Sequence, residues 1–394
     1  MTDTSDRFVR NPATWYGYFL IGTQIYLFNV QGNVIPFLQE EFSLSYRVVS
    51  LHSSAIALGV ILTGLFGRRV SARLGRRYSL WLGGCGIALG GLLLCLSPGP
   101  WESIASCFIM GLLGAFLPAV VPAALSDMHG EMRRQAFAEQ AIVAYGCAII
   151  GPLATGGFIA WGLGWRPAVV LGCLLGIGLT IVFRNVALAE PQVHAGPTTA
   201  KLPPAFWAYW FLIVFACSLE FSVLLWSPTF LERVAGFTPA NAATVAAGFF
   251  VGVLIGRIAL RALVTRYSPR TILFSAFATG AIGFVLYWIV GQQWAAIVGI
   301  VLLGLCIAPQ YPLTMALGLG VAAGANDAAS ARMTLAFGLA LLIAPAALGA
   351  LADVVGLRLA HLTLPALIAA ELVSFLAALA LSRRATPIPS QSAA

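Results

Sequence analysis

The stretch GRRVSARLGRRYS, residues 67–79, returns later in the chain as GRIALRALVTRYS, residues 256–268. Six positions are identical at a constant offset of 189 residues. Three further groups recur at nearly the same offset. Leu112, Leu113, Gly114 and Pro122 return 190 residues later, and Phe37-Leu38 and the pair Pro152 and Gly156 each return 193 residues later. The shared offset predicts two similar halves.

The sequence around these stretches is mostly apolar. Of 394 residues, 60% are hydrophobic and 9% are charged, whereas soluble domains carry about 25% charged residues. Membrane-spanning helices need about 20 apolar residues, while the strands of membrane barrels alternate over about ten. We therefore predict an all-α membrane protein with twelve transmembrane helices, at residues 14–38, 47–70, 77–97, 101–126, 135–161, 165–187, 205–231, 239–264, 270–290, 294–321, 328–353 and 358–382.

The basic residues lie between the apolar segments, so the net charge of +8 does not indicate nucleic-acid binding. With a cytoplasmic N-terminus, 18 of the 22 Lys and Arg residues fall on the cytoplasmic side. The other four are Arg47, Arg166, Arg233 and Arg358. This bias follows the positive-inside rule and predicts a multi-pass protein of the bacterial inner membrane, with both termini cytoplasmic.

A polar segment rich in Pro, Gly and Thr, residues 188–204, follows the sixth predicted span. We predict that it is a cytoplasmic linker between two six-helix halves, residues 1–187 and 205–394. Two parallel halves related by an axis along the membrane normal are a transporter architecture, with the solute site at their interface near the bilayer midplane.

On these features the whole chain resembles the major facilitator superfamily (MFS) of transporters. In that family the loop between the second and third spans runs from a glycine through an Asp to a glycine and two basic residues. Gly67, Gly75, Arg76 and Arg77 match, and Ser71 stands in place of the Asp. The family's Asp helps to latch the two halves together on the cytoplasmic side. The resemblance therefore implies a weaker or rebuilt latch, with gating roles for Ser71, Arg76 and Arg77.

The fifth span contains Gly151-Pro-Leu-Ala-Thr-Gly-Gly157. This stretch is similar to the Gly-Pro-x-x-Gly-Gly motif linked with antiporters in the family, with one extra residue before the glycine pair. The alternative is a proline-kinked helix whose small residues allow close packing. Pro152 is accordingly a candidate gating residue.

The resemblance implies that the first, fourth, seventh and tenth spans line a central cavity. Glu220 is the only acidic residue central in any of them. A polar group at membrane depth is costly unless it faces a cavity or a partner, and low-dielectric surroundings favour the neutral form of a carboxyl group. We predict that Glu220 binds a coupling proton or the solute; a structural hydrogen bond to a neighbouring helix is the alternative.

The first span is unusually polar, and Tyr26, Asn29 and Asn33 share one face of it. These three side chains are candidate solute-binding groups, and amide packing between helices is the alternative. The span has no basic residue at its centre, and neither do the other three cavity spans. Strongly anionic solutes usually need such a cation to offset their desolvation, so we expect a solute that is not strongly anionic.

The tenth span contains Pro309-Gln310-Tyr311-Pro312. The two prolines interrupt the backbone hydrogen bonds of a helix and predict a gating bend, where Gln310 and Tyr311 offer donors to a ligand. Arg257, near the cytoplasmic end of the eighth span, is a further gating candidate.

Glu139 and Arg332 also lie near cytoplasmic ends and could join Arg257 in ion pairs between the halves. Glu371 lies midway along the twelfth span, at a peripheral position of the fold, and there a structural role is expected.

These features predict a secondary active transporter that moves a small organic solute by alternating access. Proton coupling is expected, with symport and antiport left open, and the expected partners are the solute, protons and membrane lipid around a monomer. An uncoupled facilitator is the first alternative, and a non-transporting membrane sensor or assembly factor with the same fold is the second. The sequence has no nucleotide-binding loop, metal-ligand spacing or paired catalytic carboxylates. It therefore predicts no enzyme activity, cofactor or metal.

Overall fold

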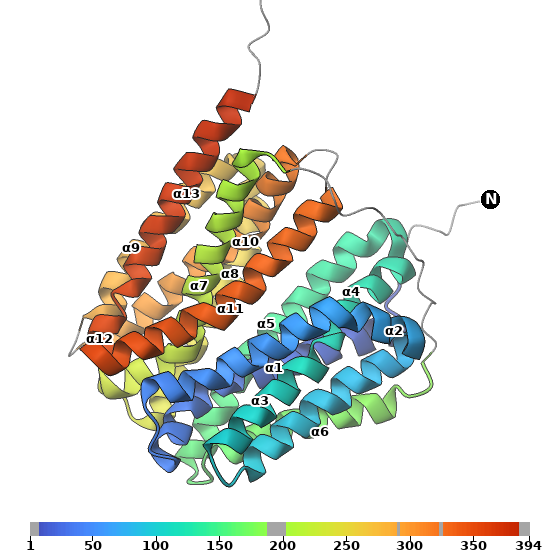
Figure 1. The fold of residues 1–394 in the computed structure, drawn as a ribbon, viewed down its shortest axis with the longest axis vertical. Coiled ribbons are helices and arrows are strands. Elements are labelled where there is room, and N and C mark those ends of the chain that lie inside the picture. The colour runs from blue at the N-terminus through green and yellow to red at the C-terminus, as the bar shows by residue number, and fades with distance from the viewer. Residues whose placement is uncertain (1–7, 187–201, 290–291, 323–325, 386–394) are drawn as a thin grey trace, which may run out of the picture.

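The structure is a computed structural model that describes residues 8–186, 202–289, 292–322 and 326–385. The described chain is built from helices packed side by side (Figure 1). The helices are α1 (Pro12–Glu41), α2 (Tyr46–Leu96), α3 (Pro100–Gly114), α4 (Phe116–His129), the 3₁₀ turn η1 (Gly130–Met132), α5 (Arg133–Ala160), α6 (Arg166–Val182), α7 (Pro204–Arg233), α8 (Pro239–Arg266), α9 (Pro269–Trp288), α10 (Gln293–Val321), α11 (Asn326–Val355), α12 (Leu357–Ala360) and α13 (Thr363–Ala385).

These helices make the twelve spans predicted from the sequence. Ten are long and apolar enough to cross a membrane, α6 is a shorter apolar helix, and α1 is the polar first span. The helix α2 holds two spans, separated at Gly75, whose φ of 77° and ψ of 166° are not helical. The helices α3 and α4 form one span, and α12 and α13 form another.

Local sequence signals set several helix starts. Asn11, Ser45, Thr238 and Ser268 precede α1, α2, α8 and α9, and each side chain accepts a hydrogen bond from the backbone N–H three residues on. These caps satisfy one of the free donors of the first turn. In α1, α8 and α9 a proline also occupies the first turn, where its missing N–H costs nothing.

Glycines bring the spans of each half into backbone contact. A Cβ on Gly111 of α3 would lie 2.2 Å from the carbonyl oxygen of Ile56 in α2. A Cβ on Gly304 of α10 would lie 2.0 Å from the carbonyl oxygen of Phe249 in α8. Small residues allow such close packing between membrane helices. Gly111 and Gly304 are 193 residues apart in the sequence, so the same contact occurs in both halves.

The two halves, α1–α6 and α7–α13, are held together by α2 against α11, α5 against α8 and α1 against α7. We call the end where α1 begins and α13 ends the terminal end, and the opposite end the far end. The halves converge at the far end and diverge toward the terminal end (Figure 1). The predicted linker, residues 188–204, lies mostly outside the described residues, and the exact domain limits stay a prediction.

A carboxylate joins the two halves at the far end. Asp353, near the end of α11, accepts hydrogen bonds from the backbone N–H groups of Tyr46 at 2.8 Å and Arg47 at 2.9 Å. These are free donors at the N-terminus of α2, where a negative charge is favourable. Arg233 at the end of α7 adds a second connection. It donates to the Tyr46 hydroxyl at 3.3 Å and lies 3.9 Å from the Glu40 carboxylate.

Candidate functional site

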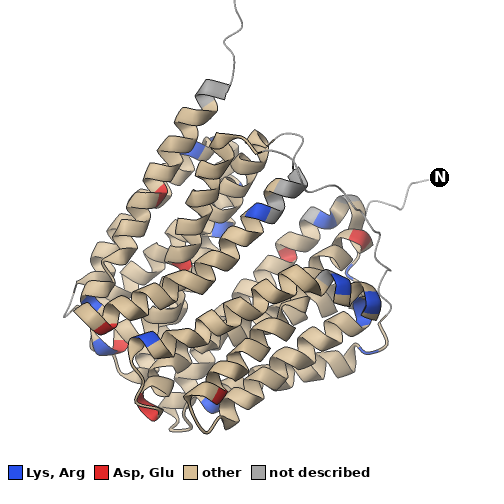
Figure 2. Cartoon of the chain, in the orientation of Figure 1, with Lys and Arg blue, Asp and Glu red and all other residues tan. Residues whose placement is uncertain are grey.

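The candidate site is centred on Glu220, near the middle of α7. Most charged residues lie near helix ends, and few lie at the depth of the helix centres (Figure 2). The side chain of Glu220 is partly exposed although its neighbours Leu219 and Phe221 are buried. A partly exposed carboxyl group at this depth is accessible to a proton or a polar solute.

Glu220 interacts electrostatically with three polar side chains from other helices. They are Arg257 of α8, Tyr145 of α5 and Tyr311 of α10. The guanidinium carbon of Arg257 lies 5.7 Å from the centre of the Tyr145 ring, within cation–π range. Tyr145 belongs to the first half and the others belong to the second, so the cluster crosses the interface between the halves.

Glu220 and Arg257 interact electrostatically, but no carboxylate oxygen of Glu220 lies within 4.0 Å of a guanidinium nitrogen of Arg257. They therefore do not form a contact ion pair. The Nε atom of Arg257 is buried and has no hydrogen-bond partner. A buried, unsatisfied charged donor is costly, so this group is available to a ligand or to Glu220 itself.

The amides of α1 lie at the same depth on the other side of the interface. A Cβ on Gly32 would lie 2.4 Å from the carbonyl oxygen of Leu224 in α7. The helices α1 and α7 both run from the terminal end to the far end. Asn29 lies one helical turn before Gly32, and Glu220 lies one turn before Leu224, so Asn29 and Glu220 are at the same depth. Asn33 is buried, its amide nitrogen donates to the carbonyl oxygen of Asn29 at 3.3 Å, and its Oδ1 has no partner.

Two predicted solute-binding residues do not join this cluster. The hydroxyl of Tyr26 is buried and donates to the carbonyl oxygen of Ala168 in α6 at 2.8 Å, inside the first half. Gln310 is fully buried inside the second half, where its amide nitrogen donates to the sulfur of Cys306 at 3.0 Å. Tyr311, the next residue, faces the cluster and packs against Phe337 of α11 with ring centres 6.4 Å apart.

The gating candidates around Gly75 make contacts within the first half. Arg76 is mostly buried and forms an ion pair with Asp127 at the end of α4. Arg77 lies 5.2 Å from the ring centre of Trp81. Ser71 is partly exposed, and its gating role stays a prediction.

Glu139 does not pair across the halves. It accepts hydrogen bonds from Arg10 at 2.6 and 2.8 Å, so this ion pair lies within the first half. The expectation that it joins Arg257 or Arg332 is therefore corrected. The physical reason is that α1 and α5 are packed side by side, which brings Arg10 to the start of α5.

The three gating prolines lie inside continuous helices. Pro152 is within α5, and Pro309 and Pro312 are within α10. Each removes a backbone donor from its helix, and their part in gating stays a prediction.

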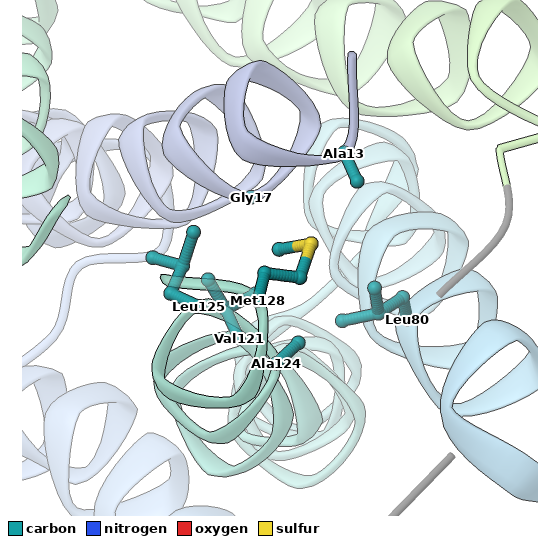
Figure 3. A pocket seen from close by; sticks show the side chains of 7 residues that line it. All are labelled: Ala13, Gly17, Leu80, Val121, Ala124, Leu125 and Met128. Atoms are coloured by element: carbon teal, nitrogen blue, oxygen red, sulfur yellow. The ribbon is translucent and has the colours of Figure 1, made fainter. Parts of the chain in front are cut away.

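Two pockets are found away from Glu220. The first, between α1, α2 and α4, is lined by Ala13, Gly17, Leu80, Val121, Ala124, Leu125 and Met128; it is apolar and too narrow to hold a water molecule (Figure 3). The second is an apolar cavity of about 540 Å³ between α7, α11 and α13. Within the described residues, no group of three or more His, Cys, Asp or Glu could hold a metal ion.

Sequence reasoning missed Tyr145 and misplaced Arg257 in depth. The helix α8 continues unbroken past Arg257 to Arg266, so Arg257 lies deeper than the end of its helix. The small residues of α5 were the available signal that this helix packs closely against another helix. A Cβ on Gly156 would lie 2.2 Å from the Thr244 hydroxyl of α8, and this close packing brings Tyr145 to the interface.

Comparisons with known proteins agree with this architecture. The family model described as "Major Facilitator Superfamily" matches residues 14–317. An uncharacterized MFS-type transporter of Yersinia pestis is 24% identical over 334 residues, covering 83% of this chain and 85% of that protein.

Three solved structures share the fold at low sequence identity. A bacterial homolog of the human lysosomal transporter Spinster, in an inward-facing and occupied conformation, has a TM-score of 0.75 at 14% identity and covers 96% of this chain and 98% of its own. A nucleoside transporter mutant has a TM-score of 0.76 at 10% identity, with coverages of 94% and 99%. A D-xylose–proton symporter has a TM-score of 0.73 at 13% identity, with coverages of 93% and 96%.

Proposed function

The chain belongs to the Major Facilitator Superfamily of membrane transporters, and we propose that it carries a small organic solute with proton coupling at Glu220. The observation that carries this proposal is the cluster of Glu220, Arg257, Tyr145 and Tyr311, which spans both halves at mid-helix depth. The similarity of the fold to that of a proton symporter supports it.

The cluster provides a simple coupling mechanism. When Glu220 is ionised, its charge compensates that of Arg257. When Glu220 binds a proton, Arg257 loses this compensation, and its unsatisfied Nε is free to bind a polar group of the solute. Proton binding and solute binding thereby become linked, because each changes the free energy of the other.

The arrangement of the halves supports alternating access. The halves converge at the far end, where Asp353 and Arg233 join them, and they diverge at the terminal end. The bias of the basic residues supports a cytoplasmic terminal end, and with that orientation we propose that this conformation is inward-open. Reaching an outward-open state requires the contacts of Asp353 and Arg233 to break.

The chemistry of the site favours a solute that is not strongly anionic. Arg257 is the cation of the site, and Glu220 compensates its charge. Asn29 and Asn33 offer amide hydrogen bonds from α1, and Tyr145 and Tyr311 offer aromatic faces. Because the solute binds Arg257 when Glu220 is protonated, we propose an uncharged or zwitterionic organic solute with an acceptor group or a single carboxylate for Arg257, carried by a monomer in the inner membrane of a bacterium.

The solute class is tested first by thermal unfolding of the purified protein. Sugars, nucleosides, amino acids, organic acids and organic cations are each added, because a ligand that binds only the folded protein raises its apparent stability. Stabilisation by dicarboxylates or phosphorylated compounds alone contradicts the proposed solute class.

Coupling is tested with Glu220→Gln in proteoliposomes, using a solute found in that screen. The variant should lose accumulation driven by a pH gradient yet keep counterflow, in which solute exchanges without net proton movement. Glu102→Gln, which changes an exposed carboxylate in the first turn of α3, serves as the matched control. Accumulation by Glu220→Gln at the wild-type level refutes the coupling role, and loss of counterflow as well indicates that Glu220 binds the solute.

A further inference from the structure

A second carboxyl group lies deep inside the second half. Glu371, midway along α13, has an exposed fraction of 0%, and neither of its carboxyl oxygens has a hydrogen-bond partner. Buried polar groups are almost always hydrogen-bonded. An acidic residue left in this state within a membrane span needs an explanation beyond packing.

The surroundings of Glu371 are polar on one side only. The side-chain amide of Gln310 on α10 is a hydrogen-bonding neighbour of the carboxyl group without reaching hydrogen-bond geometry, and the Oε1 of Gln310 is also buried without a partner. Cys306 of α10 and Cys217 of α7 lie near enough to be influenced by Glu371. On the α9 side, Phe274 and Phe277 pack against Phe375, one turn from Glu371.

No charged side chain of the described α7, α9 or α10 compensates Glu371. The titratable groups that face it from these helices are the thiols of Cys217 and Cys306. An isolated carboxylate in such a site costs far more than a neutral carboxylic acid. Glu371 therefore holds a proton in this conformation, and releasing it requires a route and an acceptor.

The helix α7 supplies that route. Cys217 interacts with both Glu371 and Glu220, and it lies three residues from Glu220 on the same face of the helix. On α10, Gln310 faces Glu371 while the adjacent Tyr311 interacts with Glu220. The thiol of Cys217 is thus the protic group that interacts with both the buried carboxyl group of Glu371 and the partly exposed one of Glu220.

We propose that Glu371 is a second proton-binding site, which exchanges its proton with Glu220 through the thiol of Cys217 during the transport cycle. The inference rests on the proposed proton coupling. In each exchange the proton leaves one carboxylic acid and binds the other carboxylate, so no further reactant is needed. The sealed site would store a proton in the half of the protein that also carries Glu220.

The test needs no solute. Infrared difference spectra of the protein in lipid are recorded between acidic and alkaline buffer for the wild type, Glu371→Gln and Glu220→Gln. Each variant should lose a different part of the carbonyl-stretch band of protonated carboxyl groups. If the Glu371→Gln spectrum equals the wild-type spectrum, Glu371 does not titrate and the proposal is overturned. If the Glu220→Gln spectrum equals the wild-type spectrum while Glu371→Gln loses part of the band, Glu220 does not titrate. The proposed function then fails, whereas Glu371 still stands as a titrating group.

Two further measurements guard against misfolding and test the route. Gln310→Leu keeps Glu371, and it should move the frequency or the midpoint of the Glu371 band without removing it. The band should also exchange severalfold more slowly after transfer to D₂O in Cys217→Ala than in the wild type. A Glu371 band unaffected by Gln310→Leu overturns the assignment, and an unchanged exchange rate in Cys217→Ala overturns the route.

Discussion

Replacing Asp353 by Asn should shift the protein away from the conformation described here. The carboxylate of Asp353 accepts from both Tyr46 and Arg47 at the N-terminus of α2, whereas a side-chain amide keeps one oxygen and carries no charge. The change removes one hydrogen bond and the attraction between the carboxylate and the helix N-terminus. It leaves the helices of each half intact.

The expected magnitude follows from these two losses. A net hydrogen bond contributes about 0.5–1.5 kcal/mol, and a charge at an exposed helix terminus contributes about 0.3–1 kcal/mol. Asp353 is exposed, so water replaces part of what is lost. We expect about 1–2 kcal/mol in favour of states open at the far end, a change of roughly 5- to 30-fold in their population relative to the closed state.

Hydrogen–deuterium exchange in lipid nanodiscs measures this shift at both ends. Amides at the start of α2 and the end of α11 should exchange about 5- to 30-fold faster, because exchange follows the population of the open state. Amides around Gly75 should exchange more slowly, because the terminal end closes as the far end opens. Glu41→Gln is the matched control, since Glu41 lies at the same end but pairs with Arg166 inside the first half at 2.5 Å. Equal exchange in the two variants, or faster exchange at the far end with no change around Gly75, refutes the reasoning.

Three further substitutions test the glycine packing and one ion pair. Gly32→Ala should destabilise the protein by about 1–3 kcal/mol, because the new Cβ would meet the backbone of α7. The Cβ of Gly146→Ala in α5 meets nothing within 4 Å, so this variant should gain up to about 1 kcal/mol of helix propensity. Equal thermal unfolding temperatures of the two variants contradict this expectation. Asp127→Asn should cost about 1–2 kcal/mol, because the ion pair with the mostly buried Arg76 is lost; an unchanged unfolding temperature shows that this pair is dispensable.

Helix number and arrangement were predictable because the bilayer imposes simple rules. A span must be long and apolar, and basic residues gather on one side. Both signals survive in the sequence, even where Gly75 joins two spans without a loop. The repeat was also visible in the sequence, but the structure corrects one of its matches: the counterpart of Gly304 is Gly111, which makes the equivalent close contact, and not Gly114.

The site was less predictable, because neighbouring residues on one helix face in different directions. Gln310 and Tyr311 are adjacent in the sequence, yet one is sealed beside Glu371 and the other faces Glu220. Arg257 was assigned to the cytoplasmic end of its predicted span, but α8 continues to Arg266, and Arg257 lies beside the ring of Tyr145. Asp353 carried no sequence signal, since its partners are backbone N–H groups more than 300 residues away.

The break at Gly75 also sets a limit on how this protein can vary in length. Surface loops usually tolerate added or deleted residues, but here a single residue separates two helical segments. Because each residue of a helix turns by about 100°, one inserted residue would rotate Gly83 and Gly90 away from Leu117 and Met110, against which they pack. The connection between the second and third spans should therefore keep a fixed length wherever related chains retain this packing.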